Sequence, residues 1–191
     1  MQLISAQNIS FSINEKKLFH NLSFNVNTGE GLYIKGSNGS GKSTLLRIIL
    51  GITLPSKGKI HFCNEDLAIS YLGHKNAIKS YLSPIQNLEL IFNQSGRALA
   101  FEWLHKLGLK NVQDELTGNL SFGQQKKLAL IRVLASSPKM IVLDEPFVGL
   151  DYATNNLLNN FLEEKLREDM SIIFTSHIQP TFECKTLEIE R

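Results

Sequence analysis

The segment of the chain with the clearest chemical potential is a glycine-rich stretch that ends in lysine and serine. Its residues fit the spacing G-x-x-x-x-G-K-[ST]. Glycines let a backbone turn tightly, so that successive N–H groups and a following helix start can face phosphate oxygens. Lys42 is then expected to reach the β- and γ-phosphates, and the Ser43 hydroxyl to bind Mg²⁺. The predicted nucleoside triphosphate site consists of Gly36, Ser37, Asn38, Gly39, Ser40, Gly41, Lys42, Ser43 and Thr44.

Two carboxylates, Asp144 and Glu145, follow directly after the apolar run 140–143. A carboxylate at the carboxyl end of a parallel strand lies where ligands bind in open α/β sheets. We therefore expect Asp144 to hold Mg²⁺, directly or through water, and Glu145 to polarise the attacking water as a catalytic base. Taken alone, the pair is equally consistent with acids that complement a helix dipole. The glycine-rich segment upstream favours the catalytic interpretation.

Alternating strands and helices are predicted to position these residues. Apolar alternation within residues 1–30 predicts short strands joined by turns, one of them at Asn14-Glu15. A strand at 31–35 should enter the glycine-rich segment and a helix at 42–50 should leave it. The apolar runs 140–143 and 171–175 are typical of buried parallel strands.

The middle third of the chain is predicted to be helical. Ser83-Pro84 indicates a helix start, residues 97–107 a helix ended by Gly108, and Ser121 to about Ala135 a long, mostly buried helix. Strand–helix alternation around such an insert predicts an α/β fold with a mostly parallel sheet.

Bulk composition is that of a single globular domain. The 191 residues are 42% hydrophobic and 20% charged, with a formal net charge of +2, which is too weak to indicate a nucleic-acid partner. The two cysteines, Cys63 and Cys184, are expected to be free thiols. No signal peptide or apolar stretch of membrane-spanning length is evident, so any membrane role is expected to come through a separate partner.

Three further motifs complete a resemblance to the ATPases of the ATP-binding cassette (ABC) type, which extends over essentially the whole chain. Residues 120–124, Leu-Ser-Phe-Gly-Gln, resemble the signature motif of that family, Gly149-Leu-Asp151 its D-loop, and Ser176-His177 its H-loop. The resemblance implies a P-loop NTPase fold with an N-terminal antiparallel β part and a helical subdomain at about 75–137, all within one domain, 1–191. It also implies ATP and Mg²⁺ as ligands, with Phe11 stacked on adenine.

The same resemblance implies a homodimer in the ATP-bound state. Two copies pack head to tail in that family, so Ser121 and Gly123 of one copy would contact the γ-phosphate held by the other. His177 would contact the γ-phosphate and the attacking water as a catalytic residue. From the residues alone, Ser121 and Gln124 also predict a helix capping box. A helix cap and a phosphate contact at Ser121 are compatible.

Two positions depart from the family pattern. Phe122 replaces the second glycine of the signature, and His74 stands where the family has a glutamine that contacts water, metal or nucleotide. Histidine as a residue type changes its charge near neutral pH, so this replacement is expected to weaken Mg²⁺ coordination. A haem-ligand role for His74 is the alternative.

Residues 71–79, followed by Leu82-Ser83 and Asn87-Leu88, resemble one branch of the family, the ATPases of cytochrome c maturation and haem export. That resemblance implies integral membrane subunits of the CcmB and CcmC type as partners. It also implies a peripheral location on the cytoplasmic face of the inner membrane, and no nucleic acid.

Three alternatives stay open from the sequence. The chain is the ATPase of another ABC transporter, a soluble ABC ATPase of DNA repair or translation, or a non-hydrolysing regulatory module. The short interval between Ser43 and Ser121, with a single cassette, disfavours the second. His74 is the only hint of the third.

Overall fold

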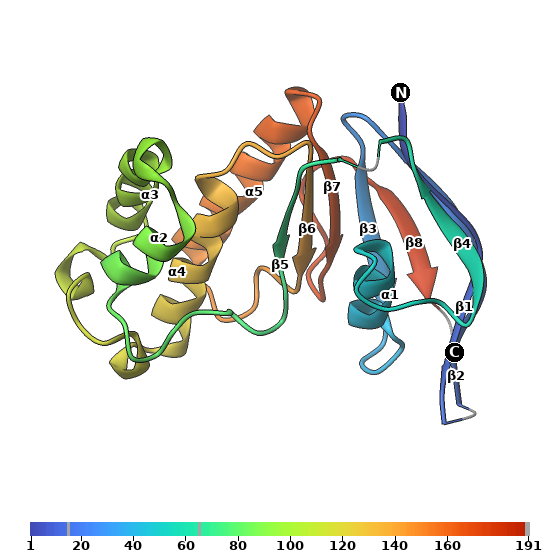
Figure 1. The fold of residues 1–191 in the computed structure, drawn as a ribbon, viewed down its shortest axis with the longest axis horizontal. Coiled ribbons are helices and arrows are strands. Elements are labelled where there is room, and N and C mark those ends of the chain that lie inside the picture. The colour runs from blue at the N-terminus through green and yellow to red at the C-terminus, as the bar shows by residue number, and fades with distance from the viewer. Residues whose placement is uncertain (15, 65, 190–191) are drawn as a thin grey trace.

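The computed structural model describes residues 1–14, 16–64 and 66–189. In this part of the chain the strands form two sheets that lie beside each other (Figure 1). The antiparallel sheet has the order β2-β1-β4, with bounds Lys16–Asn27, Gln2–Ile13 and Lys57–Phe62. The parallel sheet has the order β5-β6-β7-β3-β8, with bounds Ile69–Leu72, Met140–Asp144, Ser171–Thr175, Gly31–Gly36 and Lys185–Ile189.

Strands β1 and β2 are longer than the short strands expected from the sequence, each having 12 residues. Each strand continues through polar residues that form local irregularities within it. Asn8 and Asn21 have φ angles of 53° and 54°, and the pairing of β1 with β2 shifts register in this region. Asparagine tolerates the left-handed conformation, so such an irregularity does not end a strand. Asn14 lies in a turn, whereas Glu15 is outside the described residues.

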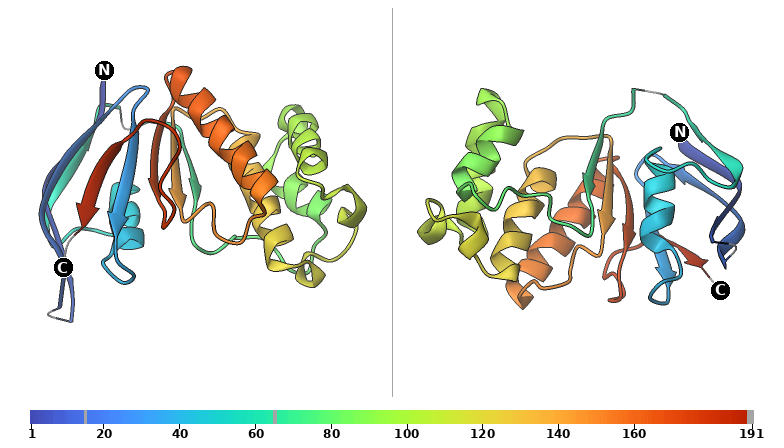
Figure 2. Two further views of the ribbon diagram at one scale, coloured as in Figure 1. Left: turned by 180° about the vertical axis from the view of Figure 1, so that it is seen from behind. Right: turned by 60° about the horizontal axis from the view of Figure 1, so that its bottom comes forward.

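Both faces of the parallel sheet are buried, which explains why β6 and β7 are continuous apolar runs. Met140 and Val142 belong to the core shared with α1 (Lys42–Ile49) and the antiparallel sheet. Ile141 and Leu143 point to the opposite core, shared with α4 (Phe122–Leu134) and α5 (Tyr152–Arg167). Figure 2 shows α1 between the two sheets and the remaining helices beyond the parallel sheet.

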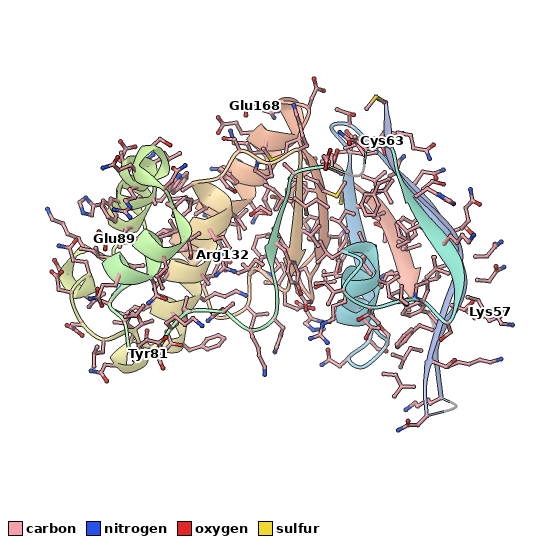
Figure 3. All side chains as sticks on the ribbon, in the orientation of Figure 1. Lys57, Cys63, Tyr81, Glu89, Arg132 and Glu168 are labelled. Atoms are coloured by element: carbon pink, nitrogen blue, oxygen red, sulfur yellow. The ribbon has the colours of Figure 1, made fainter. Side chains whose placement is uncertain are left out.

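The helical insert lies at the end of the molecule remote from the antiparallel sheet; Figure 3 labels Tyr81 and Glu89 there, far from Lys57 on β4. It comprises α2, α3 and two short 3₁₀ helices, η1 and η2, and α4 packs beside it (Figure 1). Their bounds are Pro84–Ile91, Gln94–Lys106, Lys110–Val112 and Thr117–Asn119.

The expected starts of α2 and α4 are confirmed, because Ser83 and Ser121 each form a capping box. Helix α3 begins three residues before the predicted 97, since the Asn93 side chain accepts a hydrogen bond from Gly96 N and caps the helix there. Strands β5 and β8 were not predicted.

Candidate nucleotide site

The glycine-rich segment forms the turn between β3 and α1. Gly41, at the start of α1, has φ 102°, a conformation that L side chains rarely adopt. At Gly36 the restriction is contact, because a methyl group there would lie 2.6 Å from Ser40 Oγ. The tip of the turn at Ser37, Asn38 and Gly39 is exposed to solvent, so the loop is closely packed at its base and open at its rim.

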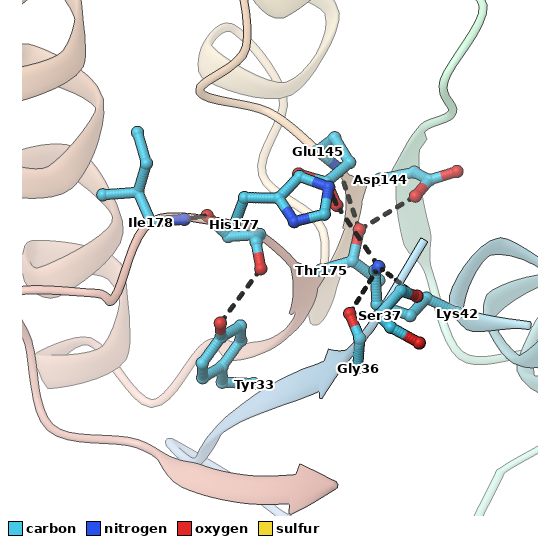
Figure 4. Close-up of polar contacts among 10 residues, drawn as sticks. Tyr33, Gly36, Ser37, Lys42, Asp144, Glu145, Thr175, His177 and Ile178 are labelled. Atoms are coloured by element: carbon cyan, nitrogen blue, oxygen red, sulfur yellow. Dashed lines mark hydrogen bonds and ion pairs between the residues drawn. The ribbon is translucent and has the colours of Figure 1, made fainter. Parts of the chain in front are cut away.

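Lys42 folds back across this turn. Its Nζ donates hydrogen bonds to Gly36 O at 2.9 Å and Ser37 O at 3.2 Å (Figure 4). The same ammonium lies 3.9 Å from Glu145 Oε1, and only 7% of Lys42 is exposed. A buried cation is thus held over the carbonyls of the turn and beside the carboxylate that follows β6. Ser43 and Thr44 lie in the first turn of α1.

Thr175, at the end of β7, organises the two carboxylates. Pairing of β6 with β7 sets Asp144 opposite Thr175. The Thr175 hydroxyl donates to Asp144 Oδ1 at 2.8 Å and accepts from Glu145 N at 2.9 Å. Because one buried hydroxyl bonds to both residues, it fixes their relative position. This role was not predicted from the sequence, although a threonine at the end of an apolar strand was the available signal.

Glu145 is held in an unusual conformation and is poorly satisfied. Its φ angle is 50°, in the left-handed region. Among the described residues, both buried carboxylate oxygens lack a hydrogen-bond partner, and Oε1 lies 3.3 Å from His177 Nε2. A buried, unsatisfied carboxylate is costly to fold and is typical of a group whose partner is a ligand.

His177 lies at the open side of this group, with 48% of its side chain exposed. The segment that carries it is anchored on both sides: Tyr33 OH donates to Ser176 O, and Ile178 N donates to Ser176 Oγ, each at 2.9 Å (Figure 4). A hollow of about 220 Å³ opens here, lined by Tyr33, Lys35, Gly36, Ser37, Ser176, His177 and Glu188. The fold therefore brings the glycine-rich turn, both carboxylates and His177 together.

Lys126 and Tyr71 are further charged or polar neighbours that the sequence did not single out for this site. Lys126, on α4, is only 3% exposed. Burial lowers the pKa of this lysine, while the nearby charges of Asp144 and Glu145 act in the opposite direction. Burial, and then the charge of Asp144, raise the pKa of the Tyr71 hydroxyl, while Arg47 opposes the shift by its charge and a hydrogen bond. Asp144, which is only 1% exposed, thus lies in a buried polar environment.

Four predicted site residues lie outside this group. Phe11, on β1, approaches it indirectly: its ring stacks on Phe19 with centroids 6.2 Å apart, and Phe19 packs near Gly41. His74 is exposed in the segment after β5. Ser121 and Gly123 lie at the start of α4, and within the described residues neither is bonded to Lys42, Asp144 or Glu145. One copy of the chain therefore assembles only part of the predicted site.

A phosphate-binding turn on a parallel sheet, combined with a helical insert and a signature-type helix start, defines an ABC-type ATPase. The family model described as ABC transporter matches residues 19–148, and the chain belongs to that family. The fold agrees: a dimeric bacterial ABC transporter cassette aligns with TM-score 0.83 at 24% identity, over 99% of this chain and 97% of that one. A nucleotide-free cassette aligns with TM-score 0.74 at 25% identity, over 93% and 82%.

Within the family, the chain resembles proteins named cytochrome c biogenesis ATP-binding export protein CcmA. The CcmA of Nitrosomonas europaea is 35% identical, over 93% of this chain and 89% of its own. That of Idiomarina loihiensis is 38% identical, over 97% and 90%. The resemblance inferred from residues 71–88 is thereby confirmed. In the described residues, no helix combines the length and apolar character needed to cross a membrane.

Proposed function

We propose that this chain is the ATP-hydrolysing subunit of an export complex for cytochrome c maturation. The observation that supports it most directly is the cluster of Lys42, Glu145 and His177, in a chain that resembles CcmA over more than nine-tenths of its length. Its membrane partners would be integral subunits of the CcmB and CcmC type. The chain would then act at the cytoplasmic face of the inner membrane, bound to it only through those subunits and without nucleic acid.

ATP would bind with its phosphates in the turn 36–44. Two features of the chain fit an anionic ligand there. Lys42 Nζ donates to two backbone carbonyls and lies 3.9 Å from Glu145 Oε1, and a phosphate would be a stronger partner for it. Ser40 Oγ is buried without a hydrogen-bond partner. Phe11 would contribute to the adenine side, and His74 to the edge of the site nearest the helical insert.

Mg²⁺ fits the same site, because a serine hydroxyl and a carboxylate are hard oxygen donors. Ser43 and Asp144 would hold the ion, which supplies charge neutralisation for the phosphates. Thr175 keeps one Asp144 oxygen engaged in a hydrogen bond, and the other would be available to the ion. Glu145 would polarise the attacking water, and His177 would hydrogen-bond to that water and to the γ-phosphate.

A second copy would complete each site. The start of α4 presents Ser121 and Phe122 to solvent, and a helix start favours an anion. Packed head to tail, Ser121 and Gly123 of one copy would bind the γ-phosphate held by the other. ATP would then join the two copies, and hydrolysis would separate them.

The test is copurification from membranes with Glu145→Gln, since a protein that binds ATP but hydrolyses it slowly should remain in its closed assembly. With Mg-ATP we expect a dimer together with integral subunits of a cytochrome c maturation system. Wild-type chain treated with apyrase serves as the control. Recovery with the membrane subunits of another transporter would overturn the assignment to cytochrome c maturation. A protein that neither retains nucleotide nor pairs would overturn the ATP-driven dimer as well.

A further inference from the structure

Phe122 is an aromatic residue at the first position of α4, and 60% of it is exposed. One side of its ring lies directly against Gly149. A methyl group placed on Gly149 would lie only 2.4 Å from Cε1 and 2.6 Å from Cδ1 of the ring. Gly149 also has φ 81°, a conformation that disfavours any other residue. The ring therefore occupies the space that a side chain at position 149 would need.

Two more contacts join the start of α4 to the segment 145–151. A methyl group on Gly123 would lie 2.9 Å from Gly149 O, so the two backbones approach closely. Lys127 Nζ forms an ion pair with Asp151 Oδ2 at 2.5 Å. Asp151 in turn caps α5 by accepting a hydrogen bond from Thr154 N at 2.8 Å. The segment thus runs from the buried Glu145 to a residue fixed on both α4 and α5.

We propose that Phe122 is a positioning residue that clamps the 148–151 segment onto the start of α4. The clamp sets the distance between Ser121 and Glu145 within one chain. This inference rests on the proposed function, in which Glu145 acts on the nucleotide of its own copy and Ser121 on that of the second. The ring consequently links the two nucleotide sites of the dimer, so that docking of Ser121 on one phosphate adjusts Glu145 at the other.

A purely structural role for Phe122 is disfavoured by its exposure. An aromatic ring that leaves most of its surface in water adds little to the core, and surface substitutions usually change stability only slightly. If Phe122 is a clamp, its substitution should change the free energy of unfolding only slightly but clearly lower the rate of ATP hydrolysis. Misplacing a reacting group even slightly lowers the rate strongly.

A double-mutant cycle on steady-state ATP hydrolysis tests the clamp. Phe122→Ala should lower kcat about threefold or more and leave KM unchanged, whereas Phe122→Tyr keeps the ring and should stay close to wild type. Gly149→Ala should lower kcat because its methyl group meets the ring, and adding Phe122→Ala should recover part of that loss. A coupling of about threefold or more is expected for residues in direct contact. Effects that simply multiply would overturn the proposal.

Hydrogen exchange of nucleotide-free protein provides a readout that does not depend on ATP. Phe122→Ala should speed amide exchange in residues 147–152. Tyr81→Ala serves as the matched control, because it removes an aromatic ring that is 69% exposed on the helical insert and should leave that segment unchanged. Unchanged exchange in Phe122→Ala overturns the clamp, even if the wild type hydrolyses ATP normally. Faster exchange in a protein that hydrolyses no ATP would retain the clamp and overturn the proposed function.

Discussion

Helices α2 and α4 begin with the same local arrangement. Ser83 Oγ accepts from Gln86 N at 3.3 Å while Gln86 Oε1 accepts from Ser83 N at 2.9 Å. At α4 the corresponding distances are 3.2 Å and 2.9 Å, between Ser121 and Gln124. Judged by these bonds alone, the two helix starts are interchangeable.

Their surroundings differ. Ser83 is 8% exposed and lies beside the buried Asn87, whose amide donates to Lys79 O, Ser83 O and Thr117 Oγ1 at 3.0 to 3.1 Å. Gln125, at the equivalent position of α4, donates only to Thr117 O and Leu120 O. Ser121 is exposed to solvent.

A capping pattern therefore predicts where a helix starts, but not whether that start is accessible to solvent. The first N–H groups of every helix lack intrahelical partners, and they can bind a phosphate only where the fold leaves them open. Tertiary packing closes α2 and leaves α4 open. Function is therefore expected at Ser121 and not at Ser83.

Glu145→Gln should have the largest effect on ATP hydrolysis, and it tests which of the two helix starts contacts nucleotide. Loss of a positioned base should lower kcat about 10²- to 10⁴-fold while ATP binding persists. In the resulting ATP-bound dimer, hydrogen exchange should slow at residues 122–125 and stay unchanged at 85–87. Equal protection of both helix starts would contradict the comparison.

Paired substitutions of the two serines come next. Each of Ser83→Ala and Ser121→Ala should lower the free energy of unfolding by about 1 kcal/mol, because each removes one helix cap. Only Ser121→Ala should also lower kcat, by about 10²-fold, the usual loss for a donor to transition-state charge. Urea unfolding and ATPase assays on both variants measure the two effects. A similar kcat for both would contradict a phosphate contact at Ser121.

Local patterns were sufficient to predict the glycine-rich turn, β6, β7, the capping box at Ser121 and the helix start at Ser83. Each depends on residues within one segment, such as a continuous apolar run for the buried strands. Strand β8 was missed because Lys185, Thr186 and Glu188 are polar and exposed at a sheet edge, which leaves only Leu187 and Ile189 as an apolar signal. Its pairing with β3 is decided by the rest of the fold.

The site was predictable only in part, for the same reason. Gly41, Lys42 and Glu145 stand out by type and spacing. The role of Thr175 depends on the register that sets Asp144 opposite it, which no local pattern encodes. Burial of Lys126 near the carboxylates likewise follows from how α4 packs.

Asn87→Ala and Gln125→Ala compare the two amides that anchor these helix starts. Asn87 is 3% exposed, and its loss leaves several buried groups unsatisfied, so we expect unfolding free energy to fall by about 3 kcal/mol. Gln125 is half-buried with two bonds, and about 1 kcal/mol is expected. Thermal and urea unfolding measure both. Equal losses of unfolding free energy would show that the buried start of α2 and the exposed start of α4 are anchored equally strongly.

The smallest expected effect is on how the free energy of unfolding depends on pH. The hydrogen bond from Lys127, and then that from Thr154 N, lower the pKa of Asp151 from 3.8 to about 2. A carboxyl whose folded pKa is depressed stabilises the fold above its unfolded pKa, and this contribution is lost as pH falls from about 4 toward 2. Because Asp151 is exposed, the contribution is about 0.5 kcal/mol.

Asp151→Asn keeps a helix-capping side chain but removes the charge. Its difference from wild type in unfolding free energy should therefore be present at pH 7 and shrink as pH falls below about 4. Ser83→Ala provides the control, because the start of α2 is held by neutral groups. Its loss of unfolding free energy relative to wild type should therefore not change with pH. A difference between wild type and Asp151→Asn that persists unchanged at pH 3 would mean that the ion pair does not tie α4 to α5. The start of α4 would then be joined to the segment 145–151 through the contacts of Phe122 and Gly123 with Gly149.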